Sequence, residues 1–138
     1  MKTPLWDIEP FPTLLFDPDL KHARKVATSL RKEGLPVEIA SDADAMLLAA
    51  RDRYFRTLVV AADLSDAACL AFLDMLRQEA PGSWLIVTCA RADEDALAIA
   101  HRHGVDSLLA VSAAVPDLFA RIAALQLRSR PRFQQFAF

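Results

Sequence analysis

Acidic residues follow the apolar runs of this sequence at positions where they could do chemistry. Asp17 ends the first run, TLLFD, and Asp19 follows after Pro18. Carboxylate oxygens are the ligands that a hard cation such as Mg²⁺ prefers in proteins. An aspartate just before a helix is also a frequent N-cap, because its side chain accepts a hydrogen bond from the first turn. Capping is the favoured interpretation for Asp19, whereas both interpretations stay open for Asp17.

The run TLVVAA, residues 57–62, raises a second question, because it ends on two alanines. Its first carboxylate, Asp63, comes one residue later. Two further apolar runs, WLIVT and DSLLAV, bring Thr88 and Ser112 to similar positions at their ends. No obvious cation accompanies Asp17, and a hydrogen bond from Thr88 would give both of these residues a structural purpose.

Apolar periodicity places these residues in a regular alternation of strands and helices. Fully apolar runs are typical of central parallel strands, and apolar residues spaced three and four apart are typical of helices with one buried face. Such alternation predicts a parallel sheet with helices on both faces and functional groups at the carboxyl ends of the strands. The expected strands are 13–17, 36–40, 57–62, 84–88 and 106–111, and the expected helices are 19–33, 41–53, 66–79, 92–103 and 115–128.

The first expected helix has a clear apolar face and a clear end. Its inward residues are expected to be Leu20, Ala23, Ala27 and Leu30. Gly34 is expected to end it, since glycine readily adopts the left-handed conformation that follows many helices.

Composition and motif content exclude several classes of function. The chain has 138 residues, of which 54% are hydrophobic and 25% charged, with a formal net charge of −2. This balance is typical of one globular domain and does not call for nucleic acid or a membrane surface. Only three glycines are present, so a glycine-rich phosphate loop is excluded, and there is no HExxH, GxSxG or Cys/His motif. We expect a cytoplasmic protein that is not an enzyme and holds neither a metal nor a cofactor.

The cysteines and histidines are not arranged as a site. Cys69 and Cys89 lie inside expected elements, and we interpret them as two buried thiols. The three histidines, His22, His101 and His103, lie on expected helices away from the strand ends. We expect them to be solvated surface residues.

The order and spacing of these motifs resemble the receiver domain of response regulators, which has the CheY-like fold. TLLFDPDLKHARKVATSLRKEGLPVEIASDADAMLLAA is similar to the opening of that domain, and WLIVTCA resembles its fourth strand. GVDSLLAV resembles the fifth strand, and VPDLFARIAAL is similar to the last helix. The resemblance covers about residues 13–128. It implies a five-stranded parallel α/β sheet in the order 2-1-3-4-5, with five helices.

The resemblance also implies phosphoryl transfer to an aspartate at the end of the third strand. Acids after the first strand would hold Mg²⁺, and a hydroxyl and a lysine would contact the phosphoryl group. Here Ala62 stands at the acceptor position, Val111 at the lysine position and Pro18 at the second acid. Asp17 matches the first acid, and Thr88 matches the hydroxyl residue. The degenerate phosphorylation pocket implied in this way consists of Asp17, Pro18, Asp19, Ala62, Asp63, Thr88, Val111 and Ser112.

The favoured interpretation is therefore an atypical receiver that acts as a protein-interaction module without phosphorylation. Two alternatives stay open. Asp63 could accept a phosphoryl group if the strand shifted by one residue, but such a slip turns every side chain to the opposite face. Alternatively, Ala62, Val111 and Ser112 could line an apolar pocket that binds a small molecule.

Receivers commonly form homodimers through the fourth helix, the fifth strand and the last helix, and the resemblance implies the same partner here. Ion pairs between protomers are frequent on that face in the winged-helix subgroup (OmpR/PhoB type). Ordinary solvated helix charges are the equally weighted alternative. The residues expected on this face are His101, Asp106, Leu108, Asp117, Phe119 and Arg121.

The end of the chain changes character after the last helix. Three arginines around Pro131 predict a linker, and FQQFAF then alternates like a strand. This segment is similar to the opening of the small sheet that precedes the DNA-binding helices in the winged-helix subgroup. We favour the receiver portion of a longer transcriptional regulator, which would contact DNA only through its output domain; a stand-alone receiver with an aromatic tail is the alternative. The expected parts are an N-terminal extension (1–12), the receiver-like domain (13–128) and the linker with its tail (129–138).

Overall fold

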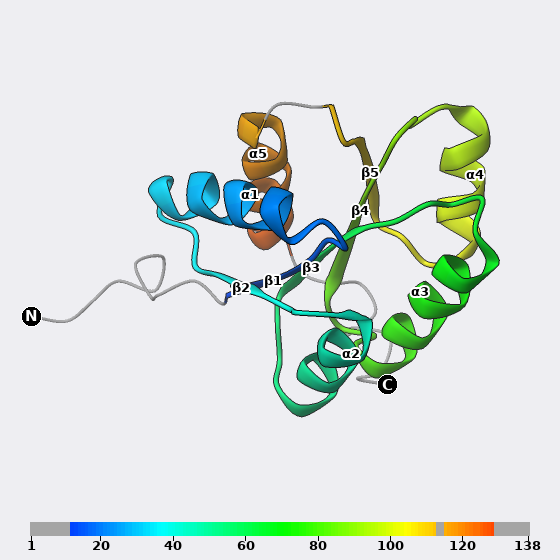
Figure 1. Cartoon of the computed structure of the whole chain (residues 1–138), viewed down its shortest axis with the longest axis horizontal. Coiled ribbons are helices and arrows are strands. Elements are labelled where there is room, and N and C mark those ends of the chain that lie inside the picture. The colour runs from blue at the N-terminus through cyan, green and yellow to red at the C-terminus, as the bar shows by residue number, and fades with distance from the viewer. Residues whose placement is uncertain (1–11, 113–114, 129–138) are drawn as a thin grey trace, which may run out of the picture.

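A computed structural model describes residues 12–112 and 115–128 of the chain. Five parallel strands form one sheet in the order β2-β1-β3-β4-β5, as the sequence predicted (Figure 1). The predicted extension, apart from Pro12, and the predicted tail lie outside the described residues. The strands are β1 Thr13–Phe16, β2 Val37–Ile39, β3 Thr57–Ala61, β4 Trp84–Cys89 and β5 Ser107–Ala110. The helices are α1 Leu20–Lys32, α2 Ala43–Asp52, α3 Ala67–Glu79, α4 Glu94–Arg102 and α5 Val115–Gln126.

The helices cover both faces of the sheet and create two separate cores. Helices α1 and α5 lie on one face, and α2, α3 and α4 lie on the other (Figure 1). Successive side chains of a strand point to opposite faces, so neighbouring residues enter different cores. In β1, for example, Leu14 packs into the core with α2 and α3, whereas Leu15 packs into the core with α1 and α5. The central strands are therefore apolar at consecutive positions, which is the pattern seen in the sequence.

Aspartates begin the first four helices. Asp19, Asp42, Asp66 and Asp93 are the N-caps of α1, α2, α3 and α4, and each side chain accepts a hydrogen bond from a backbone N–H of the first turn. The bond to Asp19 comes from the backbone N–H of His22, at 3.2 Å. Capping is thus confirmed for Asp19. None of the helices within the described ranges is long and apolar enough to cross a membrane.

The buried face of α1 differs from the prediction at one position. Ala23, Ala27 and Leu30 are buried as expected, and Val26 joins them, but Leu20 is 37% exposed. A helix of 13 residues is about 20 Å long, whereas a strand of four residues covers about 13 Å. The helix is therefore longer than the strand beside it, and its first turn has less of the sheet to pack against.

Gly34 ends α1 as predicted. Its backbone φ is +91°, and the N–H groups of Gly34 and Leu35 donate to the carbonyls of Arg31 and Leu30 at 2.9 and 3.1 Å. This pair of bonds is a Schellman motif, which satisfies carbonyls that the helix itself leaves without donors.

Replacing Gly34 with alanine is expected to lower the free energy of unfolding by about 1–2 kcal/mol, because an L-residue pays that cost in the left-handed region. An added Cβ would meet no atom within 4 Å, so the expected loss comes from the backbone alone. Urea unfolding of Gly34→Ala measures it. Glu33→Ala, at a neighbouring position with φ of −84°, is the control and should change stability by less than about 0.5 kcal/mol. Equal losses in the two variants would contradict this explanation.

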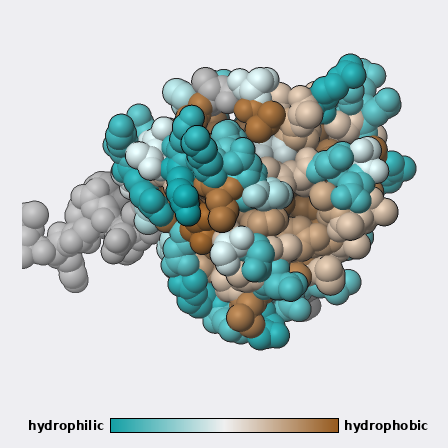
Figure 2. Space-filling view, viewed as in Figure 1, coloured by the Kyte–Doolittle hydropathy of each residue, from teal (hydrophilic) through white to brown (hydrophobic). Residues whose placement is uncertain are grey.

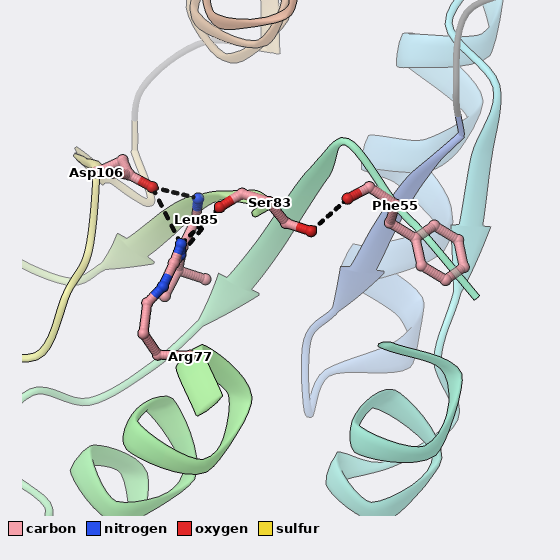
Figure 3. Close-up of polar contacts among 5 residues, drawn as sticks. All are labelled: Phe55, Arg77, Ser83, Leu85 and Asp106. Carbon is pink, nitrogen blue, oxygen red and sulfur yellow. Dashed lines mark hydrogen bonds and ion pairs between the residues drawn. The ribbon is translucent and has the colours of Figure 1, made fainter. Parts of the chain in front are cut away.

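A network of hydrogen bonds connects elements at the amino edge of the sheet, where the strands begin (Figure 3). Asp106, in the turn before β5, accepts hydrogen bonds from the backbone N–H of Leu85 at 2.9 Å and from the guanidinium of Arg77 at 3.4 Å. The same guanidinium donates to the carbonyl of Ser83, and the hydroxyl of Ser83 donates to the carbonyl of Phe55. Helix α3, the start of β4 and the turns before β3 and β5 are thereby connected.

Candidate functional site

The carboxyl edge of the sheet brings most of the predicted pocket residues together. Strand pairing sets Ala61 beside Thr88, and the N–H of Ala62 donates to the carbonyl of Thr88 at 2.9 Å. On the other side of β4, the N–H of Val111 donates to the carbonyl of Cys89 at 2.6 Å. The acceptor, hydroxyl and lysine positions implied by the resemblance are therefore neighbours in space.

Two adjoining hollows open at this edge and share Ala61, Thr88 and Val111. We call the smaller one the inner cavity; it holds about 50 Å³. We call the larger one the alanine groove; it holds about 660 Å³. The inner cavity is lined by Leu15, Asp17, His22, Val26, Val59, Ala61, Thr88, Leu109, Ala110, Val111, Val115 and Leu118. The alanine groove is lined by Pro18, Ala61, Ala62, Asp63, Leu64, Ser65, Cys69, Thr88, Cys89, Ala90, Arg91, Asp93, Asp95, Ala96, Ile99 and Val111.

Asp17 is buried, with 8% of its surface exposed, and it has a side-chain partner that the sequence analysis missed. The Nδ1 atom of His22 lies 2.7 Å from Oδ2 of Asp17. The other oxygen, Oδ1, accepts a hydrogen bond from the backbone N–H of Asp19 at 2.9 Å. The expectation that His22 lies away from the strand ends was therefore wrong. The predicted bond from Thr88 is not among the contacts of Asp17 in the described part of the chain.

The position of His22 has a signal in the sequence. It is the third residue of α1 after the cap Asp19, and the side chain at this helical position often reaches back past the start of the helix. Here it reaches Asp17 instead of the cap residue. The contact could have been proposed from the spacing, once the start of the helix had been fixed at Asp19.

Asp63 lies just beyond the end of β3 and is exposed. Its Oδ1 atom accepts hydrogen bonds from the hydroxyl of Ser65 at 2.6 Å and from the backbone N–H of Ser65 at 2.9 Å. The hydroxyl bond first, and then the backbone bond, lower the pKa of Asp63, because they stabilise its ionised form. The side chain is thus held against its own loop. Ala62, which occupies the implied acceptor position, lines the alanine groove with a methyl group.

The implied Mg²⁺ site does not fit the residues present. Both carboxylate oxygens of Asp17 already have hydrogen-bond partners, and Pro18 and Ala62 offer no side-chain oxygen. No cluster of three or more histidine, cysteine, aspartate or glutamate side chains within the described ranges could hold a metal ion. We therefore assign no chemistry at this edge to a divalent cation.

Val111, at the implied lysine position, is 45% exposed and contributes only methyl groups to both hollows. The apolar pocket predicted from Ala62, Val111 and Ser112 forms in part. Ala62 and Val111 line the alanine groove, whereas Ser112 is exposed and is not among its lining residues.

The predicted dimer face contains a third hollow, a shallow groove of about 710 Å³ between α4, β5 and α5. His101, Asp106, Leu108 and Arg121 line it, together with the exposed Leu97. The guanidinium of Arg121 also donates to the hydroxyl of Ser107, which fixes it against the fifth strand.

Asp106 also has partners outside this groove, and the two remaining residues predicted for this face, Asp117 and Phe119, do not line it. Asp106 belongs to the network with Arg77 at the amino edge, so its carboxylate is engaged inside the protomer. Phe119 is half-buried and packs against the core beneath α1 and α5. Asp117 is exposed on α5, as expected. Asp106 thus lies on the predicted face and also accepts from a backbone donor of the neighbouring strand, a contact that the sequence does not show.

The remaining histidines and cysteines partly follow the prediction. His101 is exposed, but Nδ1 of His103 lies 2.7 Å from Oδ1 of Asp74, so His103 joins α4 to α3. Neither cysteine forms a disulfide; Cys89 is buried, whereas Cys69 is half-buried, contrary to the prediction for that residue. Burial raises the pKa of both thiols, which keeps them protonated near neutral pH.

No protein-family model matches the sequence, and a search of curated proteins returns no relative. Solved structures do resemble the fold. A CheY-like response regulator receiver domain protein from Methanospirillum hungatei superposes with a TM-score of 0.76 at 20% identity, covering 91% of this chain and 98% of that chain. An orphan response regulator of H. pylori gives 0.73 at 17% identity, covering 87% and 98%.

A third similar structure contains a modified aspartate. It is a response regulator protein from Burkholderia pseudomallei with a phosphorylated aspartic acid, calcium ion and citrate. Its TM-score is 0.69 at 22% identity, with coverage of 83% of this chain and 71% of that chain. At these identities the likeness establishes the fold: five parallel strands in the order 2-1-3-4-5 with five helices, as in CheY-like receiver domains.

Proposed function

We propose that this chain is a response-regulator receiver module that works without phosphorylation and acts by binding proteins. The observation that carries the proposal is the state of Asp17. Its carboxylate is buried, and both of its oxygens already have hydrogen-bond partners within the protomer, the ring of His22 and the backbone N–H of Asp19. A receiver that accepted a phosphoryl group would need these oxygens for a cation.

The surroundings of Asp63 support the same proposal against the shifted-acceptor alternative. Asp63 lies outside β3, and its carboxylate turns toward Ser65 in its own loop. A transferring phosphoryl group carries spread negative charge and needs nearby cations to stabilise it. Of the side chains lining the alanine groove, Arg91 alone is basic, and it lies 4.0 Å from Asp93.

The proposed mode of action is association through the face formed by α4, β5 and α5. The groove on that face combines an exposed apolar side chain, Leu97, with the polar groups of His101 and Arg121. A patch with an apolar centre and a charged rim is suited to a partner that offers the same elements, including a second copy of the chain. Contact with DNA would come only through an output domain.

Incubation with acetyl phosphate and Mg²⁺ is expected to leave the intact mass of the protein unchanged. The expected result follows from the missing acceptor at Ala62 and the engaged carboxylate of Asp17. Electrospray mass spectrometry at neutral pH measures it, with a receiver domain that keeps its aspartate acceptor as the positive control for the phosphodonor.

Asp63→Ala is the matched variant for this experiment. A phosphoryl adduct that forms on the wild-type chain and disappears in Asp63→Ala would overturn the proposal and assign the acceptor to Asp63. An adduct that persists in the variant would also overturn it, with the acceptor at another side chain.

A further inference from the structure

The alanine groove is an apolar surface that the fold leaves uncovered. It lies between the connection from β3 to α3 and the connection from β4 to α4. Figure 2 shows hydrophobic residues in the area between α3 and α4 on this face of the molecule, with hydrophilic residues beside them. An exposed apolar area with polar residues around it often marks an interaction site.

Small side chains account for the hollow. Ala61, Ala62, Ala90 and Ala96 contribute one methyl group each, so the main chain lies close to the surface. Larger apolar side chains, such as Ile99, close its sides. A floor of methyl groups admits close approach by another element of structure.

The rim of the groove is acidic. Asp63, Asp93 and Asp95 line it, against the single basic residue Arg91. Asp93 caps α4 and lies 4.0 Å from Arg91, so its charge already has partners inside the protomer. Asp63 and Asp95 are both exposed, and hydrogen bonds from Ser65 keep Asp63 ionised. The carboxylates of Asp63 and Asp95 could therefore bind basic groups of another molecule.

We propose that the alanine groove is the docking site for a basic amphipathic helix of a partner protein. The apolar face of such a helix would lie on the alanine floor, and its lysine or arginine side chains would reach Asp63 and Asp95. This inference rests on the proposed function, because it names the surface and the chemistry of one protein partner.

The fold also indicates why the partner segment would be a helix. β3 and β4 are central strands whose backbone groups pair with neighbours on both sides, so no strand edge is available at the groove for an added strand. A helix satisfies its own backbone hydrogen bonds and needs only side-chain contacts. Charge complementarity selects a basic helix over an acidic one.

The test uses the full chain and a synthetic amphipathic helix made of leucine and lysine. Fluorescence anisotropy measures its affinity, and ¹⁵N–¹H spectra locate its contacts. We expect binding with amide shifts concentrated at residues 61–65 and 90–96. The same peptide with glutamate in place of every lysine is expected not to bind.

Matched variants separate docking from general attraction between opposite charges. Asp63→Lys/Asp95→Lys is expected to weaken binding at least about tenfold, equal to about 1.4 kcal/mol. Glu33→Lys/Asp44→Lys has the same net charge but changes exposed acids outside the groove, and its affinity should match the wild type. Ala90→Phe, which fills the groove without changing charge, should also weaken binding.

Several outcomes would overturn the inference. One is absence of binding, and another is equal weakening by the two charge-reversal pairs. Amide shifts confined to the groove between α4, β5 and α5 would also reject this docking site while leaving the interaction module intact. The proposed function itself fails on a different measurement, the appearance of a phosphoryl adduct in the intact mass.

Discussion

Asp106→Ala is expected to lower the free energy of unfolding by about 2–4 kcal/mol, because it removes an acceptor for a buried backbone donor and a guanidinium. The N–H of Leu85, a fully buried residue, would lose its partner, and Arg77 would lose a counter-charge. The side chains of Arg77 and Asp106 are 13% and 16% exposed, so solvent replaces these contacts only in part. Urea unfolding followed by circular dichroism measures the loss.

Asp117→Ala is the matched control, since it removes an exposed carboxylate from α5 without breaking this network. Its effect should stay within about 0.5 kcal/mol. Asp106→Asn, which keeps an acceptor oxygen for Leu85, should lose less stability than Asp106→Ala. If Asp106→Ala unfolds like the wild type and only changes the oligomeric state, Asp106 would act in the dimer face and the stabilising role of this network would be contradicted.

The variant Pro18→Asp/Ala62→Asp/Val111→Lys is expected to gain a phosphoryl group from acetyl phosphate and Mg²⁺. The three positions line the hollows around Thr88, where the resemblance to receivers places the second acid, the acceptor and the lysine. The new carboxylate would attack the phosphoryl group of acetyl phosphate and release acetate. Asp17, released from His22 as the metal binds, and the acid introduced at position 18 would hold the metal, and the lysine would neutralise the transferred charge. Intact mass measures the adduct.

The control for this experiment is Pro18→Asp/Val111→Lys, which restores the surroundings but not the acceptor. It should remain unmodified. Modification of this control would point to another acceptor, with Asp63 the first to examine. If the three-substitution variant folds but takes up no phosphoryl group, side chains other than these three also prevent phosphorylation. The contact between His22 and Asp17 would then be the first candidate to replace, because it occupies an oxygen that the metal needs.

The sheet and its helices could be predicted from the sequence because their signals are local. TLVVAA and WLIVT are apolar at consecutive positions, and the structure shows why: adjacent residues of β3 and β4 enter the two cores on opposite faces. Asp19 and Gly34 mark the two ends of α1 through hydrogen bonds that span only a few residues. Local hydrogen bonds and periodic burial depend on spacing along the chain, which the sequence displays directly.

That Ala62 and Val111 stand at the acceptor and lysine positions implied by the resemblance could also be inferred from the sequence, since the resemblance aligns whole strands whose ends meet at one edge. The contact between Asp17 and His22 could not be inferred in this way. His22 belongs to α1, and the contact depends on how that helix is rotated and placed against the end of β1. The bond could be formed by other donors at other helix positions, and the spacing alone does not choose among them.

Asp106 shows the same limit more strongly, because its partners are far away in the chain. Leu85 and Arg77 precede it by 21 and 29 residues and come from a strand and a helix that only the folded sheet brings to its side. The sequence by itself thus determined the order of the elements, the two ends of α1, and the presence of Ala62 and Val111 where the resemblance implies an acceptor and a lysine. The tertiary structure decided which charges are paired and which surfaces stay open, because these depend on distances between elements that local sequence patterns do not encode.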